Sequence, residues 1–232
     1  MTIRGVNRWV MVGVLVSVAG CGRPESLQEA ILSTSDAAEA LEKVLKNPDE
    51  LSATILFTAS RAAFQRKRLE ESAFLLYAGQ LRANFDRECF PPKGQGGNSP
   101  FVLYAALSQD CGRDINPAVM ADPAAFAAAL ERLRKWSPKA PPTYNPGYAF
   151  TARKSEADAS QAVEASRTEF LSKMSDLSTL LGDAEYAAAF RTVQAHNRLG
   201  NGARPSKEDR DQAVETMKRI ETEKGIAGLS GT

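Results

Sequence analysis

The sequence predicts an all-α fold, an irregular bundle of about seven to nine helices packed as helical hairpins. Apolar residues recur at spacings of three and four through most of the chain, and Asp-Pro, Ser-Pro and glycine-rich clusters separate these segments. No convincing stretch alternates apolar and polar residues as a half-buried strand would. With 232 residues, 43% of them hydrophobic, the chain is long enough for one large domain or two small ones.

Helices in the first part of the chain are expected where the apolar spacing and the cap residues agree. Asp36 and Glu39 have capping-box spacing, and Asn47-Pro48 ends that helix. Asp49 opens the next helix, and Ser99-Pro100 and Asp122-Pro123 each supply an N-cap with a first-turn proline. The predicted helices cover residues 25–32, 36–46, 69–87, 101–109 and 124–136, with a further one that begins at residue 49.

The last part of the chain has the longest helical pattern, over residues 156–181. Gly182-Asp183 breaks it, and the next helix carries Tyr186 and Phe190 on its apolar face as the expected antiparallel partner. A turn cluster at 199–206 precedes a final helix over 207–224. The expected division is a signal peptide (1–20), a tether (21–24), an N-terminal lobe (25–136), a Pro/Tyr-rich strap (137–154), a C-terminal hairpin with its last helix (155–224) and a frayed tail (225–232).

The N-terminus has the pattern of an export signal. Arg4 and Arg8 precede ten apolar residues, a run too short to span a bilayer as a resident helix. The run ends in Val18-Ala19-Gly20-Cys21, which resembles the lipobox of bacterial lipoproteins. The alternative is an ordinary secretory signal cut at Ala19, with Cys21 incidental.

The lipobox resemblance implies that Cys21 is acylated, with palmitate-type chains, and becomes the first residue of the mature protein. Glycine rather than aspartate follows the cysteine, which in lipoproteins of enteric type implies transfer to the outer membrane. The expected location is the cell envelope, facing the periplasm, and two or three acyl chains make a stable anchor. The mature chain would keep 27 of its 29 basic residues against 28 acidic ones, and this balance predicts no nucleic-acid binding.

The other two cysteines are expected to form a disulfide, because the periplasm oxidises such pairs and Cys89 and Cys111 would be the two that remain. Zinc binding and two separate thiols are the alternatives, although zinc normally takes four ligands. Between the cysteines, Lys93 precedes the glycines, whereas a nucleotide-binding loop needs its lysine after them. This segment is therefore predicted to be a disulfide-tethered surface loop that binds no nucleotide.

A helix pair at 49–85 shows a partial resemblance to a tetratricopeptide-type hairpin. Phe57, Phe64, Ala73 and Tyr77 match its aromatic, aromatic, small and aromatic spacing. Arg61 and Gln80 stand where small residues are expected, and no second copy follows at a fixed period. Ordinary core aromatics of any helix pair fit the spacing equally well.

The strap combines four prolines, which exclude helix, with three aromatic side chains. Two interpretations stay open: an irregular connection whose aromatics pack onto the bundle, or a partner-facing loop. In the second, the tethered loop and the strap form one binding surface. Its candidate residues are Lys93, Tyr144, Tyr148 and Phe150.

No set of residues amounts to a recognisable active site, and no cofactor or metal is expected. His196 has no serine or cysteine three or four positions away, and carboxylate pairs such as Glu70/Glu71 lie among cations. The sequence therefore predicts a non-catalytic, lipid-anchored module that binds another envelope protein, as assembly, secretion-accessory or immunity lipoproteins do. The alternative is an enzyme acting on peptidoglycan or another envelope substrate, which would need two facing carboxyl groups in a cleft.

Overall fold

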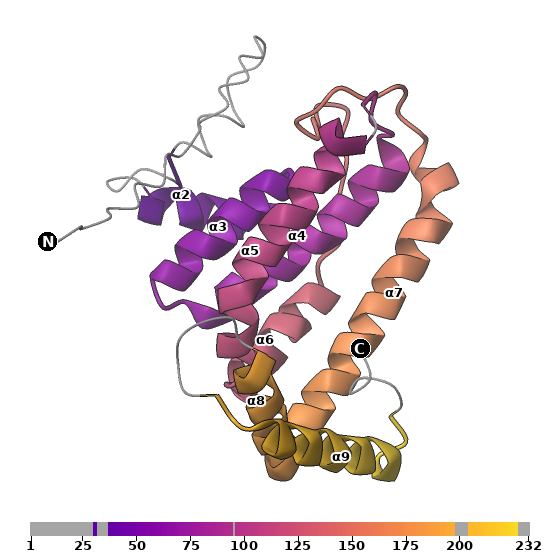
Figure 1. Cartoon of the computed structure of the whole chain (residues 1–232). Coiled ribbons are helices and arrows are strands. Elements are labelled where there is room, and N and C mark those ends of the chain that lie inside the picture. Colours follow the sequence, from indigo (N-terminus) through magenta and orange to yellow (C-terminus); the bar gives the residue numbers. More distant parts are fainter. Residues whose placement is uncertain (1–29, 32–36, 95, 198–203, 227–232) are drawn as a thin grey trace, which may run out of the picture.

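The computed structural model describes residues 30–31, 37–94, 96–197 and 204–226, and they form an all-helical body (Figure 1). Within these residues no strand is present, and Pro92 and Phe150 form an isolated β-bridge. The predicted all-α class is confirmed. The helices are α2 (Ala37–Lys46), α3 (Ala53–Gln65), α4 (Leu69–Cys89), α5 (Pro100–Met120), α6 (Pro123–Arg134), α7 (Glu156–Leu181), α8 (Ala184–Asn197) and α9 (Lys207–Glu223), with 3₁₀ turns η1 (Pro48–Glu50) and η2 (Gly96–Asn98).

Helix α4 is the centre of the molecule. It packs against α3, α5, α6 and α7, and it is apolar all round over residues 73–79, as a fully buried helix should be. Even Ser72, Arg82 and Asp86 on this helix are completely buried. Helices α3, α5, α6 and α7 are therefore positioned by direct contact with α4, whereas α9 reaches the bundle through α8.

Gly79 allows helices α3 and α4 to pack unusually close together. A Cβ atom added at Gly79 would come within 2.9 Å of the Phe57 ring, which is shorter than any ordinary contact. The two helices thus form a tight hairpin. Whether this hairpin is of the tetratricopeptide type stays a prediction.

Helix α5 is about twice as long as the sequence pattern predicts, because it continues beyond Gln109 to Met120. The predicted helix stopped where polar residues, Gly112 and Pro117 interrupt the apolar run. The buried side chains Tyr104, Cys111, Ile115 and Val119 nevertheless follow one another at helical spacings. Pro117 lies in the last turn, where a missing backbone donor affects few hydrogen bonds. The Ser99 and Asp122 caps are as predicted, since their side chains accept from Phe101 N and Ala125 N.

The predicted disulfide between Cys89 and Cys111 is wrong, and so is the disulfide-tethered loop: no bridge joins the two buried cysteines. Gln80 donates to Ser108 (2.9 Å) and Tyr77 to Asn116 (3.2 Å), so the part of α5 around Cys111 lies opposite residues 77–80 of α4. Cys89 lies nine residues beyond Gln80, roughly 14 Å along the helix axis. A disulfide requires Cα atoms within about 7 Å.

The two helices of the expected C-terminal hairpin have different main partners. The long helix α7 packs against α4 and α6: Tyr77 and Phe170 have ring centroids 6.0 Å apart, and Arg134 donates to Ser175 (2.7 Å). Helix α8 pairs chiefly with α9, where Tyr186 donates to Glu221 (3.0 Å). Although the strap lies between α6 and α7 in the sequence, α7 returns to pack directly on α4 and α6.

Several predictions fall on residues that the structure does not describe. The signal peptide (1–20), Cys21 and its tether, and the Asp36 cap lie outside the described residues. Of the predicted tail, Gly225 and Ile226 are described, and Ile226 packs against the core. No described helix combines the length and apolar character that crossing a membrane requires.

Candidate functional site

The α4–α5 loop and the strap meet at one end of the bundle, at the top of Figure 1. Lys93 N donates to Ala149 O (3.0 Å) and Thr151 N donates to Pro91 O (2.8 Å), on either side of the Pro92–Phe150 bridge. We call this region, residues 87–94, 96–106 and 140–155, the loop end. It holds all four residues that the sequence singles out as a candidate binding surface.

Three of these four residues point inward. Tyr144 is buried, and Tyr148 and Phe150 are half-buried. The rings of Tyr144 and Phe150 pack on Phe90, with centroids 5.4 and 5.2 Å away. Tyr148 donates to Phe90 O (2.9 Å) and Asp86 O (3.2 Å), carbonyls at the C-terminal end of α4. The aromatic side chains hold the strap on the bundle, and Lys93 alone is exposed.

Under the strap lies a buried polar centre made by Arg82 and Asp86, two residues that the sequence did not single out. Arg82 donates from Nη1 to Lys139 O (2.9 Å) and from Nη2 to Asp49 O, and its guanidinium lies 4.6 Å from the Tyr144 ring centroid. The hydroxyl of Tyr144 lies 2.8 and 2.9 Å from the two Asp86 carboxyl oxygens. In the sequence, Arg82 directly follows Leu81 and Asp86 directly follows Phe85. These positions beside apolar residues of the predicted buried face are the sequence feature that could have indicated their burial.

Burial raises the pKa of Asp86 to about 7, while the Arg82 charge and the Tyr144 hydrogen bond act in the opposite direction. A carboxyl group with such a pKa can serve as a general acid or base when substrate reaches it. Here the group is completely buried and the Tyr144 hydroxyl bonds its oxygens. The geometry therefore supports a structural role, in which Asp86 fixes the strap to α4.

Glu221 is the other buried acid among the described residues. It accepts from Tyr186 between α8 and α9, whereas Asp86 accepts from Tyr144 of the strap. The strap and α9 lie at opposite ends of the molecule (Figure 1). The two buried carboxyl groups do not face each other, so they do not form the paired arrangement that glycan hydrolysis needs.

His196 contacts the backbone before α9, and the described residues contain no candidate metal centre. His196 Nδ1 lies 2.9 Å from Pro205 O, a contact that connects the end of α8 to the residues before α9. Within the described residues no group of three or more His, Cys, Asp and Glu side chains could hold a metal ion. Cys111 is buried, and its thiol donates to Phe57 O (3.6 Å).

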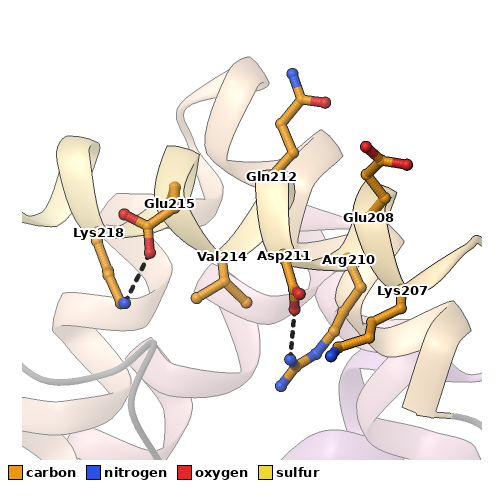
Figure 2. A pocket seen from close by; sticks show the side chains of 8 residues that line it. All are labelled: Lys207, Glu208, Arg210, Asp211, Gln212, Val214, Glu215 and Lys218. Atoms are coloured by element: carbon orange, nitrogen blue, oxygen red, sulfur yellow. Dashed lines mark hydrogen bonds and ion pairs between the residues drawn. The ribbon is translucent and has the colours of Figure 1, made fainter.

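A shallow hollow lies on the outer face of α9, lined by residues of this helix alone (Figure 2). Val214 is half-buried at its centre, with an ion pair on each side: Arg210 with Asp211 (2.7 Å) and Lys218 with Glu215 (2.9 Å). A hollow with walls from one helix cannot enclose a small molecule, which sites normally bury almost completely. Its lining consists of one apolar side chain, Val214, surrounded by charged and polar ones.

Comparison with protein-family models, with curated proteins and with solved structures finds no match to this chain.

Proposed function

We propose that this protein is a lipid-anchored, periplasm-facing helical module that binds another envelope protein and catalyses no reaction. The lipobox-like Val18-Ala19-Gly20-Cys21 supports the anchor and the compartment. Assembly factors, secretion accessories and immunity lipoproteins are the corresponding classes of function. An anchor holds the module at high local concentration against other envelope components, which suits a binder of modest affinity.

The observation that carries the binding role is the outer face of α9. Four of the charged side chains around Val214 form ion pairs, Arg210 with Asp211 and Lys218 with Glu215, so an incoming surface meets neutralised charge at these positions. Arg219 pairs with Glu185 of α8 (2.6 Å), which connects α9 to α8, and with Glu223 of α9 itself (2.8 Å). A partner that covers Val214 would remove apolar surface from water within this polar rim.

Site-specific photo-crosslinking in cells tests this surface. A benzoylphenylalanine replacing the exposed Gln212 should yield one discrete adduct with an envelope protein, and the same group replacing Gln109 on α5 is the matched control. The additional change Asp211→Lys should weaken the Gln212 adduct several-fold. Equal adducts at both positions, or none at Gln212, would contradict binding through α9.

The anchor has its own test. Cys21→Ser should leave an unlipidated precursor or release the protein from the membrane fraction, and mass spectrometry of the wild-type N-terminus should find the acyl chains. Membrane association that the substitution does not change, together with a lipid-free N-terminus, would count against the anchor.

A further inference from the structure

The first turn of α5 exposes two large apolar side chains side by side. Val102 is 53% exposed and Leu103 is 52% exposed, and they are the exposed large hydrophobic residues of the described part of the chain. Their neighbours Phe101 and Tyr104 pack on Tyr148 of the strap instead. The helix is thus fixed through one side, and the adjacent side presents Val102 and Leu103 to solvent.

The loop end that carries this apolar pair has an excess of basic residues. By sequence the loop end contains Arg87, Lys93, Arg153 and Lys154 but a single acidic side chain outside the core, Glu88. The guanidinium of Arg87 lies 5.1 Å from the ring centroid of Phe101, the residue before Val102. The whole chain has 29 basic and 28 acidic residues, so this positive excess is local.

The backbone that carries these side chains is held in place. Lys93 N is bonded to Ala149 O (3.0 Å), Lys154 N to Cys89 O (2.9 Å) and Ser99 N to Gly96 O (3.0 Å). Gly96 has φ +65°, which glycine adopts without strain. Positions that are ordered before contact lose less entropy on binding.

Apolar side chains on an exposed turn beside lysine and arginine are typical of protein surfaces that contact anionic bilayers. The apolar groups enter the headgroup region, and the basic groups meet lipid phosphates through their long side chains. An acidic protein is the competing partner. The bilayer is favoured because Val102 and Leu103 lie on a helix turn at the tip of the bundle, and because the proposed anchor at Cys21 would hold the molecule on a membrane.

We propose that the loop end lies against an anionic phospholipid surface, with Val102 and Leu103 inserted among the headgroups and Arg87, Lys93 and Lys154 facing phosphates. This contact goes beyond the proposed function. It orients the anchored molecule with the strap toward the membrane and with α9, at the other end, away from it (Figure 1).

An environment-sensitive nitrobenzoxadiazole label tests the contact in the full-length, lipidated protein. The label is placed on Leu103→Cys, and on Gln212→Cys of α9 as the matched control; the native Cys89 and Cys111 are buried. The protein is reconstituted in vesicles of phosphatidylcholine alone or with phosphatidylglycerol added. The label at 103 should brighten several-fold with phosphatidylglycerol, and the label at 212 should not change. Lys93→Glu with Lys154→Glu, or high salt, should abolish the change.

Three outcomes would overturn the proposal: a label at 103 that stays aqueous on anionic vesicles, an equal response at 103 and 212, or a response that requires added envelope proteins. Flotation of the vesicles reports the Cys21 anchor separately. If the protein proves unlipidated, the same labelled variants are added to preformed vesicles, and the response at 103 still decides the matter. Failure of the anchor and failure of the loop-end contact are therefore distinguishable.

Discussion

Asp86 is a carboxyl group in an environment far from its ordinary one. The carboxyl group is completely buried in α4, beside Arg82 and against Tyr144. Its pKa rises from 3.8 to about 7 because burial disfavours the charged form. In the folded protein Asp86 therefore retains its proton at pH values where the unfolded chain has lost it, which makes stability depend on pH.

The sign of this dependence follows from the raised pKa. The stabilisation that comes from the extra proton on folded Asp86 is fully present below about pH 4 and is lost as the pH rises to about 7. Over this range the unfolding free energy falls by at most about 1.4 kcal/mol per pH unit. Asp86→Asn removes this titration. We expect the unfolding free energy of the wild type, relative to Asp86→Asn, to fall between about pH 4 and pH 7 in urea titrations and to level off above. If the difference in unfolding free energy between the wild type and Asp86→Asn does not vary with pH, the raised pKa of Asp86 is contradicted.

Tyr144→Phe provides a second test of the same centre. The hydroxyl of Tyr144 lowers the pKa of Asp86, so its removal should move the upper end of the titration to higher pH. The loss of a buried hydrogen bond should also cost about 1–3 kcal/mol of stability.

The thiols of Cys89 and Cys111 are expected to survive in an oxidising compartment because packing keeps them apart. Both should react with a maleimide only after unfolding, and without prior reduction. Mass spectrometry of non-reduced tryptic peptides provides the measurement. Linked peptides, or labelling that requires a reductant, would contradict the structure.

Among the elements, the α3–α4 pair depends on a single close approach. Gly79→Ala improves intrinsic helix propensity by about 1 kcal/mol, but its methyl group would meet the Phe57 ring at 2.9 Å. Because both residues are buried, we expect net destabilisation of about 1–3 kcal/mol. Gly97→Ala, where nothing lies within 4 Å, is the matched control and should have little effect. Equal melting temperatures for the two variants would show that the contact is not restrictive.

Helix α9 begins with a complete capping box. Ser206 Oγ accepts from Asp209 N (3.0 Å), and the Asp209 carboxylate accepts from Ser206 N (3.0 Å). Ser206→Ala should cost about 1 kcal/mol of stability, measured by denaturant titration. Ser206→Asp keeps an acceptor at the same position and should restore most of the loss, whereas two equally destabilised variants would argue against the cap.

For the whole molecule, Arg82 connects three segments distant in the chain. It binds carbonyls of Asp49 and Lys139 from the middle of α4, and it lies over the Tyr144 ring. It therefore joins η1, α4 and the strap into one body.

Arg82→Ala should destabilise the protein by about 3–5 kcal/mol, because it leaves the other polar groups of the buried centre without their partner. The strap should become sensitive to proteolysis at the same time. Lys139→Ala is the matched control, because the exposed Lys139 side chain pairs with Asp49 at the surface and should matter little. A strap that resists protease in Arg82→Ala would mean that the aromatic contacts alone hold it.

The sequence by itself determined the all-α class, the Ser99 and Asp122 caps and most helix boundaries, because these depend on local periodicity and cap chemistry. It predicted a lipid anchor at Cys21, which the structure does not test. Tertiary structure decided the remainder. Helix α5 continues past Pro117 because its buried face continues, and Cys89 and Cys111 stay apart because their helices align out of register. The strap aromatics turn inward because Arg82 and Asp86 are buried beneath them. Local spacing does not specify that Arg82 and Asp86 are buried or that Val102 and Leu103 are exposed. These outcomes depend on contacts between segments that are distant in the chain.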